Sequence, residues 1–201
     1  MRIRTLVSSI VFLVLAGCAS TAFKSTWKNP QAGPVALAGK KVLVIASNVP
    51  TAVRTTIEAA VSDELTKAGA IAMPSRQFLG PDATKEEAKA KLAAEGYDAA
   101  WVVRMTNREQ EVYSTPGMYA PSGPYMSYWG WGGGYGYGGS EVRTDTKVYI
   151  ETLVYSVSHD QLAWSGLSVT TNPGDLNAAA GELTRVALEE MKKNGLLTPT
   201  P

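Results

Sequence analysis

Residues 40–69 read KKVLVIASNVPTAVRTTIEAAVSDELTKAG, and this stretch predicts how the chain folds. Its first part, residues 40–46, is a short apolar run typical of a buried strand. Apolar residues then recur at helical spacing before Gly69: Val53, Ile57, Val61, Leu65 and Ala68. This spacing predicts an amphipathic helix with a glycine stop. A strand that leads directly into such a helix suits a right-handed crossover to a parallel strand.

The residues that follow repeat this order of strand and helix. Residues 70–73 form a second, shorter strand candidate. Thr84 and Glu87 have the spacing of a capping box, which predicts a helix that runs to Glu95. Residues 98–105 predict a third strand, and the polar continuation to Tyr113 is expected to project beyond the core.

The second half of the chain predicts an antiparallel meander and a last helix. Apolar and threonine side chains alternate with polar ones over residues 141–154, which is typical of a long strand with one solvated face. Residues 158–161 turn the chain, and residues 162–169 return as another strand. Helical spacing resumes from Leu176 to Met191 and ends in cations and Gly195, as expected for a helix terminus.

We therefore expect one α/β (α+β) domain over residues 40–197. It should have two layers, with a mixed sheet of about five strands packed on one face by two or three helices. Residues 113–140 are expected to form a loop rich in Gly, Tyr and Trp between two strands.

Residues 1–17 have the three-part plan of an export signal. The apolar run over residues 5–16 is shorter than the roughly 20 residues that a membrane-spanning helix needs. It ends in Leu-Ala-Gly-Cys at residues 15–18, which resembles the lipobox of bacterial lipoproteins. The resemblance implies cleavage before Cys18 and lipidation of its thiol. Ala19 follows, which by resemblance to Gram-negative lipoproteins implies sorting to the outer membrane with the domain on the periplasmic face.

Residues 18–39 show little periodicity and predict a tether between the lipid and the domain. Phe23 and Trp27 lie within it and could dock on the domain, which a pure tether does not require. Of the 19 Lys and Arg, two lie in the export signal, whereas all 18 Asp and Glu lie after it. This near-neutral balance argues against nucleic acid as a partner.

Several short segments together resemble a family of small bacterial lipoproteins whose domain has no assigned function. They are the lipobox, KSTWKN at 24–29, KVLVI at 41–45, YDAAWVVR at 97–104, IETLVY at 150–155 and LAWSG at 162–166. The family's domain is similar to the amino-terminal α/β domain of the periplasmic Tol-system propeller protein and to related envelope assembly lipoproteins. The resemblance implies a role in the envelope by binding, and it supplies no catalytic residues.

The candidates for chemistry are few. His159 is the only histidine, and it lies between Ser158 and Asp160 in a predicted turn. A catalytic triad needs convergence in space, which consecutive residues rarely achieve. With one histidine and one cysteine, no zinc site is expected, and we expect no cofactor. Arg104 could pair with a carboxylate on a neighbouring strand, such as Glu151, or extend from a sheet edge into water.

The stretch SYWGWGGGYGYGG at residues 127–139 lies in a segment without charge between Glu111 and Glu141. It contains the spacing of a dinucleotide-binding loop, but a strand instead of a helix is expected to follow, so we reject that interpretation. Three hypotheses stay open: a mobile connector, a surface for protein contact or self-association, and a surface on which rings stack against a glycan. The candidate contact residues are Tyr125, Tyr128, Trp129, Trp131, Tyr135 and Tyr137.

The sequence thus predicts a membrane-anchored periplasmic lipoprotein that acts as a non-enzymatic binding or assembly module of the cell envelope. Its partners would be the membrane, through lipid on Cys18, and an envelope protein or a second copy of the chain. The alternatives are a peptidoglycan binder and, less favoured, an envelope hydrolase that uses His159.

Overall fold

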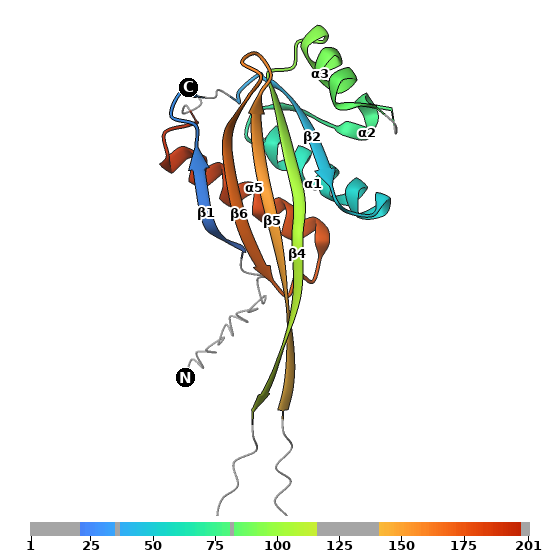
Figure 1. Ribbon diagram of the computed structural model, residues 1–201, viewed down its shortest axis with the longest axis vertical. Helices are drawn as coiled ribbons and strands as arrows, with labels where there is room; N and C mark the ends of the chain where they lie inside the picture. The colour runs from blue at the N-terminus through green and yellow to red at the C-terminus, as the bar shows by residue number, and fades with distance from the viewer. Residues whose placement is uncertain (1–20, 35–36, 81–82, 116–140, 198–201) are drawn as a thin grey trace, which may run out of the picture.

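A computed structural model describes residues 21–34, 37–80, 83–115 and 141–197. Its elements in chain order are β1 (Thr21–Lys28), β2 (Lys41–Ser47), α1 (Thr51–Lys67), β3 (Ile71–Pro74), α2 (Ser75–Phe78), α3 (Lys85–Ala94), β4 (Ala99–Thr115), β5 (Glu141–Ser156), β6 (Gln161–Thr171) and α5 (Leu176–Lys193). The strands form one open sheet, and helices pack against it (Figure 1). The expected α/β domain with a mixed sheet is confirmed.

The sheet has six strands in the order β1-β6-β5-β4-β2-β3. Strands β3 and β4 run parallel to β2 on its two sides, whereas β4, β5, β6 and β1 form antiparallel pairs. The parallel part follows the predicted crossovers, and the antiparallel part follows the predicted meander. The capping box of α3 is present, because Thr84 accepts from the Glu87 amide and the Glu87 side chain accepts from the Thr84 amide.

The main core lies between the sheet and the two long helices, α1 and α5, which cover one face of it (Figure 1). Trp101 of β4 and Trp164 of β6 are fully buried there, together with Leu65 of α1 and Leu183 of α5. Burial of each large apolar side chain stabilises the fold by about 1.5–3 kcal/mol. This layer therefore joins β2, β4, β5 and β6 to the two long helices.

The expected packing of two or three helices on one face holds for α1 and α5, whereas α2 and α3 pack on the other face. Phe78 of α2 and Leu92 of α3 pack with Leu43 and Tyr97 in a second cluster, whereas Val42 and Val44 face the main core. The physical reason lies in β2, which is flanked by parallel strands and buried on both faces. A strand that is apolar at every position needs cover on both sides, and α3 supplies it on the second face.

The tether that the sequence predicts over residues 18–39 is wrong for residues 21–28. Residues 21–28 form β1, an edge strand that pairs with β6. The Phe23 ring packs edge-to-face on Trp164, with 5.5 Å between ring centroids. Gly166 makes room for this contact, because a Cβ atom there would lie 2.5 Å from each of the two rings. The aromatic docking thus adds a sixth strand to the sheet.

One buried carboxylate joins three elements on the α1 side of β2. Glu58 of α1 is fully buried and accepts hydrogen bonds from the Ala46 amide at 3.1 Å and from Ser75 Oγ at 2.6 Å. The Arg76 amide contributes a third, longer contact of 3.4 Å. Buried polar groups cost stability unless they are hydrogen-bonded. Glu58 therefore holds α2 against the carboxyl end of β2.

Candidate binding surface on the β4–β5 ribbon

The most distinctive part of the structure is a long β-ribbon made by the distal halves of β4 and β5. We define the ribbon as residues 107–115 paired with residues 141–149. Its outer part, beyond Lys147, extends past the helices and past the ends of the other strands (Figure 1). Beyond the pair Lys147↔Thr171, the described residues offer β5 no strand partner other than β4. The sequence predicted this projection from the polar continuation of β4, and the structure confirms it.

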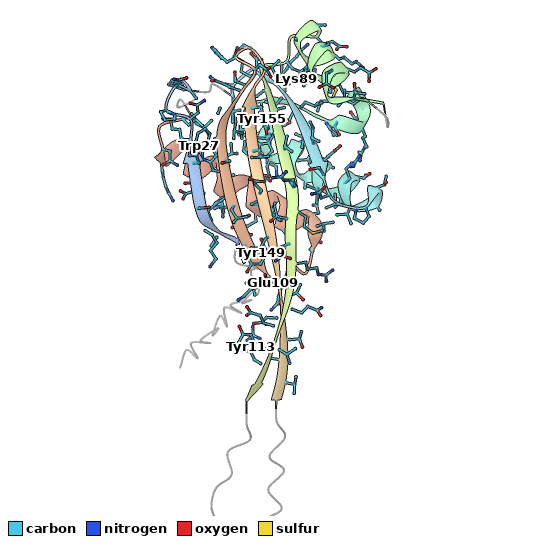
Figure 2. All side chains as sticks on the ribbon, viewed as in Figure 1. Trp27, Lys89, Glu109, Tyr113, Tyr149 and Tyr155 are labelled. Carbon is cyan, nitrogen blue, oxygen red and sulfur yellow. The ribbon has the colours of Figure 1, made fainter. Side chains whose placement is uncertain are left out.

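One face of the ribbon carries a ladder of charged and phenolic side chains. Across the two strands, Lys147 binds Glu111 at 2.6 Å and the Tyr149 hydroxyl donates to Glu109 at 3.0 Å. Figure 2 shows Tyr149, Glu109 and Tyr113 following one another along the ribbon. The ladder continues inward to Arg104, whose Nε donates to Glu151 at 3.0 Å. Of the two alternatives that the sequence left open for Arg104, the structure shows the pairing with Glu151.

Electrostatics favour the ionised state of the ladder. Hydrogen bonds from Lys147 and then Tyr113 lower the pKa of the Glu111 carboxyl below its usual value. Hydrogen bonds from Asn172 and then Arg143 lower the pKa of Asp145 in the same way. Glu111 and Asp145 lie directly opposite one another, an arrangement that would repel without the neighbouring cations. The alternation of signs therefore lets two carboxylates face each other across the ribbon.

The other face of the ribbon carries one charged side chain, Arg108 at its base, and is neutral and partly apolar beyond it. On it, Val112 is paired with Thr144, and Val142 lies one pair further toward the tip. The two valines are 66% and 60% exposed although both are paired in strands. Unpaired strand edges and exposed apolar side chains are the features by which sheets recruit another chain. The ribbon therefore has the chemistry of a protein contact surface.

The sequence-predicted contact residues lie outside the described residues. This applies to Tyr125, Tyr128, Trp129, Trp131, Tyr135 and Tyr137, and to the predicted lipid site Cys18. The aromatic tract that contains the six rings joins Thr115 to Glu141, which are the last paired residues of the ribbon. The interpretation of these residues as contacts stays a prediction, and the described ribbon is the support from which they extend.

The only histidine lies at the opposite end of β5, in the turn to β6. Ser156 Oγ and Ser158 Oγ each lie 3.0 Å from His159 Nδ1, so Ser158 and His159 do converge, against the expectation from sequence. Asp160 takes the left-handed conformation, with φ of 46°, and its carboxylate pairs with Lys89 of α3. A triad needs a carboxylate that orients the imidazole. Asp160 does not fill that role here.

A hollow of about 210 Å³ lies beside His159, lined also by Tyr155, Lys40 and Asp98. Asp98 is the only carboxylate among the lining residues, and it already binds Lys40 Nζ at 2.9 Å and the Lys41 amide at 3.0 Å.

Within residues 21–34, 37–80, 83–115 and 141–197, no cluster of three His, Cys, Asp or Glu could hold a metal ion. None of the helices in these same ranges is long and apolar enough to cross a membrane.

Sequence reasoning missed Glu58 as a buried residue and missed a groove at the base of the ribbon, described below. A signal for Glu58 exists in its position three residues before Val61 and seven before Leu65, on the apolar stripe of α1. No such signal exists for the groove, because its lining comes from four segments that are distant in sequence.

Comparison with known proteins finds similarity in structure only. No protein-family model matches the chain, and no curated protein matches it. The structure is similar to a PelC dodecamer from Paraburkholderia phytofirmans, with a TM-score of 0.49 and 13% identity over 88% of this chain and 99% of that one. It is also similar to lipoprotein GNA1162 from Neisseria meningitidis, with a TM-score of 0.43 and 13% identity over 77% of this chain and 99% of that one. Similarity at this level carries no functional argument, so the proposals below rest on the chain's own residues.

Proposed function

We propose that this chain is a lipid-anchored periplasmic lipoprotein of the outer membrane that acts as a non-enzymatic binding or assembly module of the cell envelope. Cys18 holds the domain at the membrane, and the ribbon with its aromatic tract engages an envelope protein or a second copy of the chain. The observation that carries this proposal is the projecting ribbon with its exposed valines.

Two further points support the proposal. The lipobox-like segment at residues 15–18 and the single cysteine agree with an anchor at Cys18. The charges of the ladder are paired on the ribbon itself. Because opposite charges alternate on one exposed face, the same face is complementary to a second copy of itself or to a partner with a similar pattern.

The test is site-specific photo-crosslinking in intact cells. A photoreactive amino acid replaces Val112 on the ribbon, and a control chain carries it at Glu189, an exposed position on α5. We expect a discrete cross-linked species from position 112 and none from position 189. Equal labelling at the two positions, or none at position 112, would contradict the ribbon as the contact surface.

A second variant separates the ribbon from the aromatic tract. Residues 116–140 are replaced by Asn-Gly, a sequence that forms the tight turn of a hairpin. Because Thr115 and Glu141 are already paired, a two-residue turn closes the ribbon without strain. We expect the domain to stay folded and the cross-link at position 112 to weaken at least fivefold. An unchanged cross-link would assign the contact to the ribbon alone.

The glycan alternative is distinguished by the rings of the tract. If the aromatic tract stacks on sugars, purified peptidoglycan retains the chain, and Trp129→Ala combined with Trp131→Ala releases it. If the tract contacts protein, the double variant changes the cross-linked species and leaves retention by peptidoglycan unchanged. Mass spectrometry of the purified chain, compared with Cys18→Ala, tests the anchor independently of both.

A further inference from the structure

A large groove lies where the ribbon leaves the domain. Its volume is about 690 Å³, within the roughly 300–1,000 Å³ typical of small-molecule sites. Its apolar lining residues are Val49, Pro50, Val53, Met105, Val148 and Pro173. They come from the loop between β2 and α1, from the start of α1, from β4 and β5, and from the loop before α5. The groove thus lies on the helix-covered face of the sheet, beside the last residues that the helices cover.

The position of the groove follows from the topology of the sheet. After β2, the chain crosses through α1 to β3 on one side, whereas after β4 it turns to β5 on the other side. Strand β2 ends at Ser47, which pairs with Arg104, whereas β4 continues past this point to Thr115. Val49 and Pro50 leave the sheet here, and Met105 is the first residue of β4 beyond its pairing with β2. The groove therefore lies where β4 loses this neighbour.

The lining also restricts the chemistry of the occupant. Arg108 is the only charged side chain among the lining residues, and no carboxylate is among them. In the described part of the chain, the Arg108 guanidinium has no hydrogen-bond or ion-pair partner. Asn172 lines the groove, and its side chain is fixed by two hydrogen bonds: it accepts from the Thr146 amide at 2.7 Å and donates to Asp145 at 2.8 Å. Such a groove suits a hydrocarbon chain with a polar carbonyl or anionic group at one end.

The start of β1 brings a source of such a chain close to the groove. Thr21 is paired with Thr170, Thr170 with Val148, and Val148 with Arg108, so these residues form one row across four strands. The Thr21 and Thr170 hydroxyls lie 2.9 Å apart. Two strand spacings separate Thr21 from Val148, which is about 10 Å. Cys18 precedes Thr21 by three residues, which span at most about 11 Å.

From this row and the apolar lining we infer that the groove binds one acyl chain of the lipid carried on Cys18. The inference rests on the lipidation in the proposed function and adds a site on the domain for part of that lipid. An acyl chain held there is shielded from water when the lipoprotein is not in a bilayer, and the bilayer competes for it otherwise. The anchor and the fold are then coupled through β1.

The test uses a photoreactive palmitate analogue, with a diazirine in its chain, supplied to cells that express the full chain. The analogue enters phospholipids and from them the lipid on Cys18. After irradiation of intact cells, the chain is purified and digested, and cross-linked peptides are identified by mass spectrometry. We expect labelled peptides that contain residues 49–53, 105–108 or 146–148.

Matched tryptophan variants inside and outside the groove separate an effect of filling the groove from a general effect of an added ring. Val148→Trp fills the groove and is expected to reduce its labelling at least fivefold, whereas Ile71→Trp at an exposed position on the edge strand β3 leaves it unchanged. Met105→Phe is a second filling variant of smaller volume, used if Val148→Trp fails to fold by circular dichroism. If the chain carries the lipid mass on Cys18 but labelling is confined to phospholipid or to peptides outside the groove, the groove inference is overturned and the proposed anchor stands. Absence of that mass would instead overturn the proposed anchor.

Discussion

The two halves of the β4–β5 pair differ in their strand neighbours and in burial, although they belong to the same two strands. Near residues 99–103, β4 lies between β2 and β5, and Trp101 is fully buried under the helices. Beyond Asn107, β4 pairs with β5 alone among the described strands, and Val112 is 66% exposed. The alternation of side chains is the same in both halves. What differs is whether anything covers the apolar face, so burial rather than strand formation separates the stable body from the proposed contact surface.

The largest expected effect is in the covered half. Trp101→Ala should lower the free energy of unfolding by about 3–5 kcal/mol, because it removes a fully buried aromatic side chain and leaves a cavity. Urea unfolding of the unlipidated Cys18→Ala chain, followed by circular dichroism, measures this. Trp101→Phe is the matched control and should cost much less, since the indole N–H has no acceptor in the described structure. Val112→Ala on the ribbon should change the free energy by no more than about 0.5 kcal/mol.

The next effect concerns the buried carboxylate at the end of β2. Glu58→Leu leaves the Ala46 amide and the Ser75 hydroxyl without their acceptor, at a cost of roughly 1–3 kcal/mol for each buried donor. Glu58→Gln keeps one acceptor oxygen and should lose less. The same urea titration compares the two variants. If both lose equally, or neither loses stability, Glu58 does not join α2 to β2 as described.

A smaller effect is expected where the edge strand joins the covered half. Gly166→Ala places a methyl group 2.5 Å from the Phe23 and Trp164 rings and should cost about 1–3 kcal/mol while loosening β1. Gly181→Ala in α5 is the matched control, because its Cβ would lie 3.6 Å from Glu64 Cγ, an ordinary contact. That helix-interior change should stabilise the fold by about 0.5–1 kcal/mol. Thermal unfolding of both variants checks whether the signs are opposite.

The smallest effect is a pH dependence confined to the ribbon. Lys147 and Tyr113 lower the folded-state pKa of Glu111, and Asn172 and Arg143 lower that of Asp145. Carboxyls with a lowered pKa stabilise the fold above their unfolded pKa, and the contribution is lost as the pH falls through the folded-state value. Below a pH of about 4, near the unfolded values of Asp and Glu, the ladder should therefore loosen.

Methyl NMR measures this difference directly. The Val112 and Val142 signals should shift between pH 7 and about pH 3 while those of Val42 and Val44 in the core stay unchanged. Glu111→Gln should remove part of the shift at Val112 without changing the core signals. Simultaneous change at all four valines would contradict a local effect.

The comparison also explains which features were predictable. Local periodicity was sufficient for β2, α1, the capping box of α3 and the alternation of β5, because each depends on neighbours within one element. It left the Arg104–Glu151 pair as one of two alternatives, because a contact between two strands depends on their register as well as on local pattern. It failed for β1, because Thr21–Lys28 is a strand only by virtue of its pairing with β6, which lies more than a hundred residues away.

By itself, the sequence determined the α/β class, the order of the elements from β2 onward and the projection of β4, because apolar spacing and capping residues act over a few positions. It also provides the lipobox-like segment on which the proposed anchor rests. Only the tertiary structure decided that α3 lies on the second face, that Phe23 docks on Trp164 and that a groove opens beside Val148. These features depend on side chains from distant segments that meet only when the sheet is assembled, and no local pattern encodes where such segments meet.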